Sequence, residues 1–254
     1  MRNFYLKDFE SIRCRRMGVW KRIYRNRFSE TQIMSEFIDS LALRAEHRIL
    51  DMGCGYGKKL KILEKKGLKP LGVDISKSIV GANLADGLNC MTLEEWEKTS
   101  ESYELIIMSH VIEHFLPNDL MNFMNHCLSR LKIRSYLIIA TPLMSRVFFH
   151  DFDHIRPYPP QAIAQMFIVD KPQAQFHSKY KLELIDVRTR KREIKLSPMT
   201  ALYLRRNWPR FEGFVVGVLE WMYRLSRGFI GQTDGWIGLY KNKGCRNTVQ
   251  DLSE

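Results

Sequence analysis

The stretch RILDMGCGYGKKLKILEKKGLKPLGVDIS, residues 48–76, decides the fold of this chain. An apolar run ends at Leu50, and glycines follow at Gly53, Gly55 and Gly57. Glycine has no Cβ to obstruct a tight turn or a ligand that lies against its backbone. The stretch therefore predicts a buried strand that leads into a ligand-binding turn.

The second half of the stretch continues the same unit. Residues 58–66 have helical spacing and stop at Gly67, and residues 70–73 form an apolar strand that ends at Asp74. A carboxylate at this place can accept hydrogen bonds from both hydroxyls of a ribose. The unit predicts a nucleotide ligand, and a glycine turn that binds nothing is the alternative.

Two details argue against a dinucleotide. The glycines are spaced GxGxG rather than GxGxxG, and Asp51 stands before the first of them. A pyrophosphate favours a helix N-terminus without a nearby carboxylate, whereas a ligand with sulfonium and ammonium groups favours an acid there. The segment resembles the first motif of the class I S-adenosylmethionine-dependent methyltransferases.

That resemblance implies S-adenosylmethionine as cofactor. In the family, the acid at the position of Asp51 lies near the methionine moiety, the acid at Asp74 holds the ribose, and Ile75 flanks the adenine. An acid after the third strand, which many members use for the adenine, is missing here, so Thr92 or the backbone must serve. The implied cofactor-binding residues are Asp51, Gly53, Cys54, Gly55, Gly57, Asp74, Ile75, Thr92, Ser109 and His110.

Composition narrows the class further. The 254 residues suit one large domain with additions, and the net charge is +12. The five cysteines are scattered without a CxxC pair, which favours a reducing, cytoplasmic compartment over a disulfide framework. The N-terminus lacks the apolar core of a signal peptide, and no apolar run reaches the length of a membrane span.

Positive charge is concentrated near the N-terminus. Residues 11–28 hold seven arginines and lysines with no acid, and Trp20, Tyr24 and Phe28 recur every fourth residue. An aromatic helical stripe edged by cations suits an anionic membrane surface or nucleic acid. A lid helix over the active site is the favoured reading, and nucleic acid is the less favoured partner.

The order of elements predicts an α/β fold. Helical and strand-like segments alternate from residue 29 to residue 140, which is typical of a parallel sheet with helices on both faces. Two further strands are expected at residues 182–188 and 236–241. With the resemblance, this implies a Rossmann-like, seven-stranded, mostly parallel sheet. We expect a basic extension over residues 1–28, a methyltransferase domain over 29–254 and a helical insertion at about 194–232.

The segment YELIIMSHVIEHF, residues 103–115, carries the second motif. It resembles the fourth motif of the family, a strand followed by a Glu-His pair. The O-methyltransferases of ubiquinone biosynthesis, a narrower resemblance, present ExxEH here and hold a divalent metal with it. In this chain His110 replaces the first glutamate, and His110, Glu113 and His114 could bind zinc or manganese. The alternative is that Glu113 and His114 only pair and cap a helix.

The segment FFHDFDHIRPYPPQAI, residues 148–163, follows the fifth strand, where the family builds its acceptor site. A general base must take the acceptor's proton, and histidine has a suitable pKa, especially beside an aspartate. His154 is the first candidate and His150 the second, with Asp153 as an orienting acid. Candidate substrate contacts are Asp151, Arg156 and Tyr158.

Together these motifs predict an S-adenosylmethionine-dependent O-methyltransferase. Its expected acceptor is small or amphipathic: a quinone precursor, a glycan or a lipid-linked substrate. RNA methylation is the alternative among enzymes, and a non-catalytic S-adenosylmethionine-binding partner subunit is the alternative outside them. Peripheral contact with an anionic membrane is left open, and the sequence does not predict an oligomeric state.

Overall fold

The structure, a computed structural model, describes residues 27–145, 148–169, 177–194, 196 and 198–246. The described residues form two compact units, one within 34–189 with 234–246 and one within 27–33 with 190–233. Residues 1–26 are not among those described. The predicted basic and aromatic helix over 11–28 therefore lies outside the described residues, apart from its last two.

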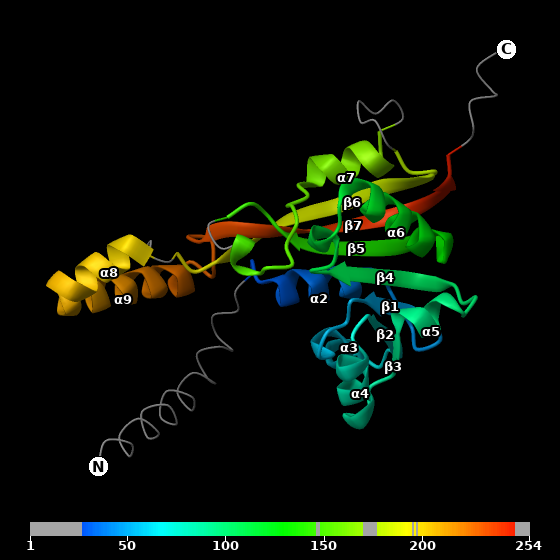
Figure 1. Ribbon diagram of the computed structural model, residues 1–254, viewed down its shortest axis with the longest axis horizontal. Coiled ribbons are helices and arrows are strands. Elements are labelled where there is room, and N and C mark those ends of the chain that lie inside the picture. The colour runs from blue at the N-terminus through cyan, green and yellow to red at the C-terminus, as the bar shows by residue number, and fades with distance from the viewer. Residues whose placement is uncertain (1–26, 146–147, 170–176, 195, 197, 247–254) are drawn as a thin grey trace. The chain divides into compact units, whose positions relative to one another are not determined.

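The sheet has seven strands in the order β3-β2-β1-β4-β5-β7-β6 (Figure 1). Strands β1 to β5 pair in parallel, and β7 runs antiparallel to β5. The predicted seven-stranded, mostly parallel sheet is confirmed. The strands are β1 (Ile49–Met52), β2 (Pro70–Asp74), β3 (Cys90–Thr92), β4 (Tyr103–Ser109), β5 (Leu131–Pro142), β6 (Tyr180–Arg192) and β7 (Gln232–Cys245).

Helices occupy most of the connections. They are α2 (Glu30–Ser40), α3 (Lys58–Glu64), α4 (Lys77–Ala85), α5 (Leu93–Glu97), α6 (Pro117–Ser129), α7 (Pro160–Phe167), α8 (Pro198–Asn207) and α9 (Pro209–Leu225). Two 3₁₀ turns, Ile112–His114 and Phe148–His150, follow β4 and β5. The helical spacing of the sequence continues to residue 44, but helix α2 ends at Ser40.

Both faces of the central strand β4 are covered. Successive residues of a strand point to opposite faces. Ile106 and Met108 share a core cluster with Leu120 and Met124 of α6, and the oppositely directed Leu105 and Ile107 are also fully buried. This explains why residues 105–108 of the strand are all apolar, as is typical of central parallel strands.

The connection into β5 is irregular. Residues 131–135, at the start of β5, read LKIRS and contain no glycine. Leu131 already pairs with Tyr103, the register then shifts, and Tyr136 pairs with Leu105. Arg134 adopts a φ of 67° within this bulge. The chain thus makes the turn with a strained arginine in place of glycine.

Gly72 lies in a closely packed part of the core behind the glycine turn. A Cβ there would stand 2.7 Å from Leu60, 2.8 Å from the Cys90 Sγ and 2.9 Å from the Cys54 Sγ. Strand β2 and helix α3 approach closely because this residue has no side chain.

We expect Gly72→Ala to lower the free energy of unfolding by about 1–3 kcal/mol, since three buried groups would have to move. Urea denaturation followed by circular dichroism measures this. Gly81→Ala is the control, because Gly81 lies in helix α4 with no atom within 4 Å of the added methyl. That change should be neutral or stabilise by up to about 1 kcal/mol. Equal losses in the two variants would contradict the packing argument.

Candidate active site

The carboxyl ends of β1, β2, β4 and β5 meet at one edge of the sheet. Ligands of open α/β sheets bind at this edge, beside the strand where the order reverses. Here that strand is β1, with β2 on one side and β4 on the other. The predicted site residues follow these four strands directly.

The loop after β1 is a tight turn of left-handed glycines. Gly53, Gly55 and Gly57 have φ values of 71°, 50° and 68°. The Gly53 and Cys54 N–H groups both donate to the Val73 carbonyl, at 2.8 and 3.0 Å. These two hydrogen bonds hold the turn to the end of β2. Residues with a Cβ rarely adopt these φ values, so the turn requires glycine.

Two of these glycines also permit close approaches. A Cβ on Gly53 would lie 2.4 Å from Val111 in the loop after β4. A Cβ on Gly57 would lie 2.3 Å from Leu88 and 3.1 Å from the Asn83 Oδ1. Gly55 has open space beside it, as a residue facing a ligand should. The turn is packed on two sides and open on one.

Asp74, at the end of β2, is fixed by backbone groups. Its Oδ2 accepts from the Gly55 N–H and its Oδ1 from the Ser76 N–H, each at 3.0 Å. A carboxylate has about four acceptor positions, so each oxygen keeps capacity for one further donor. The side chain of Ile75 beside it is largely exposed. This geometry suits two ribose hydroxyls and one face of an adenine.

Asp51 and Cys54 are both buried beneath the turn. Asp51 is fully buried at the end of β1. Burial raises the pKa of the Cys54 thiol, so the thiol stays neutral. Because that thiol packs against Cys90 and Gly72, only the backbone of Cys54 is left to face a ligand.

Thr92 is engaged at the start of α5. Its hydroxyl accepts from the Glu95 N–H at 3.2 Å, and its backbone N–H donates to the Glu95 carboxylate at 2.8 Å, which makes a capping box. The hydroxyl also donates to that carboxylate at 2.8 Å. Its part in adenine binding stays a prediction, and the hydroxyl proton is already used. Ser109 is buried at the end of β4, and His110 follows it with a φ of 59°, a left-handed conformation unusual for a residue with a Cβ.

Glu113 is the centre of the second half of the site. It is fully buried, its Oε2 accepts from the Thr141 hydroxyl at 3.0 Å, and its Oε1 lies 3.1 Å from the His110 Nδ1. Its backbone carbonyl accepts the N–H groups of Ile155 and Arg156, at 2.9 and 3.3 Å. One residue thus joins the ends of β4 and β5 to the loop that follows β5.

His154 projects from that loop toward Glu113. Its Nδ1 lies 2.7 Å from the Phe148 carbonyl, which can only accept, so Nδ1 carries the proton. The other ring nitrogen, Nε2, lies 3.6 Å from the Asp151 Oδ2 and 4.0 Å from the Glu113 Oε1. The ring is therefore oriented by a backbone group, and its lone pair faces two carboxylates.

His114 is held in the same way. Its Nδ1 lies 3.0 Å from the Asp153 carbonyl, and its ring centre is 5.0 Å from that of His154. One donor atom each from Glu113, His114 and His154 lies within 4.8 Å of the others. The sequence predicts Glu113 and His114 in such a group, but the third member in the structure is His154, whereas His110 pairs with Glu113 from outside it.

The other predicted residues of the loop are exposed or packed in the core, and Asp151 among them approaches His154. His150, Asp151, Asp153 and Arg156 are exposed, and Asp153 meets His114 through its backbone only. Tyr158 is buried, donates its hydroxyl to the Phe115 carbonyl at 2.8 Å, and has its pKa raised by that burial. A direct contact of Tyr158 with the acceptor stays a prediction, and the side chain as described packs in the core.

Comparison with known protein families shows to which family the chain belongs. The model of a family described as "Methyltransferase domain" matches residues 24–171, more than half of the chain. The chain belongs to the methyltransferase family. Its fold and matched domain make it a class I S-adenosylmethionine-dependent methyltransferase, with S-adenosylmethionine as methyl donor.

Curated relatives match the methyltransferase over part of its length. The ubiquinone biosynthesis O-methyltransferase of Bradyrhizobium diazoefficiens is 30% identical over 102 residues, which cover 37% of this chain and 39% of that protein. The protein of the same name from Rhodopseudomonas palustris strain BisB5 is 29% identical over 110 residues, 40% of this chain and 42% of that protein. The methyltransferase thus spans about two fifths of the length of these relatives.

Solved structures share the fold. The YcgJ protein from Bacillus subtilis superposes with a TM-score of 0.54 at 15% identity, covering 83% of this chain and 97% of that one. A SAM-dependent methyltransferase from Archaeoglobus fulgidus gives 0.50 at 18% identity, covering 89% and 99%. At these identities the likeness is evidence for the fold alone.

Sequence reasoning missed two buried polar residues of the methyltransferase. Asn83 donates to the Gly55 carbonyl at 2.7 Å and so holds the turn from α4. Thr141, fully buried at the end of β5, donates to Glu113. Both residues are polar at positions where the pattern of a helix or strand predicts burial. Such residues indicate a hydrogen bond, because buried polar groups are nearly always hydrogen-bonded.

The donor set of Glu113, His114 and His154 fits a divalent metal. Two imidazoles and a carboxylate suit zinc, manganese or iron. Both imidazoles donate Nδ1–H to a backbone carbonyl, which is how proteins orient histidine ligands for bonding through Nε2. A metal bound there would act as a Lewis acid on an acceptor oxygen.

We expect Asp74→Ala to weaken S-adenosylhomocysteine binding by roughly 10- to 100-fold, because it removes hydrogen bonds to a charged acceptor. Isothermal titration measures the affinity, and thermal melting checks that the turn still folds. Asp86→Ala is the matched control, since Asp86 makes only an exposed ion pair with Lys61 among the described residues. Unchanged affinity in Asp74→Ala would contradict the assignment of this carboxylate to the ribose.

Proposed function

We propose that the methyltransferase methylates a hydroxyl oxygen of a small, amphipathic acceptor and that His154 is the general base. Methyl transfer from a sulfonium is an in-line displacement that needs positioning and, for a hydroxyl, removal of one proton. The observation that carries the proposal is the environment of the His154 Nε2. Its lone pair is fixed by the bond from Nδ1 to the Phe148 carbonyl.

The two neighbouring carboxylates suit this role. When Nε2 takes a proton the ring becomes a cation, and Asp151 at 3.6 Å and Glu113 at 4.0 Å would stabilise it. Glu113 is the stronger partner, because it is fully buried and a charge interacts more strongly where water is excluded. His150, the second candidate base, is exposed and has no contact of this kind among the described residues.

Apolar side chains of the same loop support an amphipathic acceptor. Met144, Phe149, Phe152 and Ile155 are all exposed, and Phe152 is 98% exposed. Exposed apolar groups around a polar centre are typical of sites that bind a molecule with an apolar part. The relatives named for ubiquinone biosynthesis agree with a phenolic quinone precursor. A glycan or another lipid-linked substrate remains within the proposal.

A divalent metal at Glu113, His114 and His154 is the second candidate feature of the same site. It would use the Nε2 lone pair that the base role needs, so His154 cannot fill both roles at once. With a metal bound, we expect Asp151, whose Oδ2 lies 3.6 Å from the His154 Nε2, to accept the proton instead.

No helix in the part of the chain described here is long and apolar enough to cross a membrane. A cytoplasmic location is part of the proposal, supported by the free thiols of Cys54, Cys90, Cys127 and Cys245.

The acceptor class can be tested with donor labelled in its methyl group. We expect transfer to catechol-type phenols, with greater kcat/KM when the phenol carries an alkyl tail, because the exposed apolar side chains would bind the tail. Phenols with and without the tail form the matched pair, and total RNA is offered separately. Transfer to RNA alone, or S-adenosylhomocysteine binding without any transfer, would contradict the proposal.

His154→Ala should lower kcat by about 10²- to 10⁴-fold, the usual contribution of a general base. The pH–rate profile should also change, because the group that takes the acceptor's proton is lost. His150→Ala is the control and should keep both rate and profile. Should His154→Ala keep the wild-type pH–rate profile, another group must take the proton.

Metal binding can be measured without turnover. We expect the protein, freed of metal, to bind Mn²⁺ or Zn²⁺ at one site in isothermal titration and His114→Ala to lose that site. His110→Ala should retain it, because His110 lies outside the group of donor atoms. A loss in His110→Ala as large as that in His114→Ala would restore the ligand set predicted from the sequence, and no binding to the wild type would exclude a metal.

A further inference from the structure

The insertion between β6 and β7 forms a helical hairpin with an unusual surface. Helices α8 (Pro198–Asn207) and α9 (Pro209–Leu225) are joined by the single residue Trp208 and pack against each other (Figure 1). Among the described residues of α9 only Tyr223 is buried. The hairpin belongs to the smaller unit and contains none of the predicted cofactor or acceptor residues.

One side of α9 is a continuous apolar stripe. Its members follow one another at intervals of three and four residues, which places them on one face of a helix. They are between 36% and 67% exposed. The stripe consists of Phe211, Phe214, Val218, Trp221 and Leu225.

The stripe is not the surface that α9 uses against α8. Glu212, on the neighbouring row of the helix, pairs with Arg205 of α8 at 3.2 Å. That row faces the partner helix, and the stripe lies beside it. Helix α8 adds its own exposed side chains, Met199, Leu202 and Tyr203.

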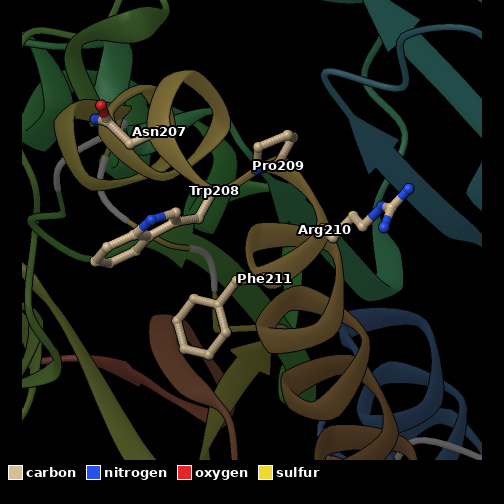
Figure 2. Close-up of a pocket in the computed structure, with 5 residues that line it drawn as sticks. All are labelled: Asn207, Trp208, Pro209, Arg210 and Phe211. Carbon is tan, nitrogen blue, oxygen red and sulfur yellow. The ribbon is translucent and has the colours of Figure 1, made fainter.

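Aromatic side chains gather at the tip of the hairpin. Figure 2 shows Trp208 and Phe211 projecting to the same side of a surface hollow formed by residues 207–211. Their ring centres are 6.3 Å apart and the rings are perpendicular, while Tyr203 lies 6.5 Å from Trp208. Tryptophan and tyrosine are enriched at membrane–water interfaces, where one part of the ring is apolar and another is wet.

The hairpin carries a net positive charge, because it has more arginines than acids. Its two acids are both paired, Glu212 with Arg205 and Glu220 with Arg224. Arg206, Arg210 and Arg227 have no ion-pair partner among the described residues. Among the described residues, the hairpin thus offers two cations without an ion-pair partner, followed by Arg227 just after α9, beside an apolar stripe. This arrangement complements an anionic surface with an apolar interior.

We propose that the α8–α9 hairpin is a membrane-docking element that lies in the headgroup region of an anionic bilayer, with the α9 stripe turned into it. Neither helix is long and apolar enough to span a membrane, so the contact is shallow. This docking does not depend on which acceptor is methylated.

Vesicle flotation of the full-length protein tests the proposal. We expect binding to phosphatidylcholine vesicles that contain about 30% phosphatidylglycerol, weak binding to phosphatidylcholine alone, and release at high salt. The Phe214→Ser/Trp221→Ser variant should bind about tenfold more weakly, because two interfacial anchors are lost. Ile133→Ser, which removes an exposed apolar side chain from the other unit, is the control and should bind as the wild type does.

Charge is tested separately. Arg206→Glu/Arg210→Glu should lower binding to the anionic vesicles about tenfold or more, and Lys65→Glu/Lys69→Glu, a double reversal on exposed residues of the other unit, should change it far less. Binding should persist after removal of residues 1–26. Affinity for S-adenosylhomocysteine should be the same in all hairpin variants, which also shows that the larger unit folds in them.

Several results would overturn the proposal. The proposal fails if the Phe214→Ser/Trp221→Ser variant, the stripe variant, binds vesicles as tightly as the wild type. It also fails if removal of residues 1–26 alone abolishes binding. A dimer in light scattering that the stripe variant dissociates, with no vesicle binding by the wild type, would assign the stripe to a second copy of the chain. An altered KM in the stripe variant without vesicles, together with no vesicle binding, would make the hairpin a lid.

Discussion

A buried carboxylate must be paired, and the candidate site depends on how Glu113 meets this requirement. Its oxygens reach Thr141 and His110, and its backbone carbonyl takes two N–H groups of the acceptor loop. An unpaired charge at this depth would be strongly destabilising. The ends of two strands and the loop after β5 are consequently fixed relative to one another, and His154 is brought beside the acid by that loop.

The half of the site that is predicted to bind the cofactor depends on a different constraint, which is the absence of side chains at the glycines of the turn after β1. Three left-handed glycines let the chain turn after β1, and the missing Cβ of Gly53 lets the loop after β4 come into contact with it. The two halves of the site therefore meet at Val111, one residue beyond the strained His110. Strain of this kind persists only where the surroundings enforce it and is frequent at functional sites.

The sequence predicted most of the fold because its signals are local. Glycine spacing, apolar strands and the acid at Asp74 are each signals of a few neighbouring residues, and a mostly parallel sheet follows from the alternation of strands and helices. The contacts across the site were less predictable. His154 joins His114 only because the loop folds back on Glu113, and Thr92 is drawn into a capping box by Glu95, three residues later. The hidden role of Asn83 likewise depends on the packing of α4 against the turn.

The close contacts at Gly72 bear on how this sequence can change over time. Three side chains from three elements, Cys54, Leu60 and Cys90, converge on the space that a Cβ would fill. A larger residue at 72 becomes acceptable only when one of these three becomes smaller, and a larger neighbour is acceptable only while position 72 remains glycine. Among relatives of this chain, the four positions should vary together rather than one at a time.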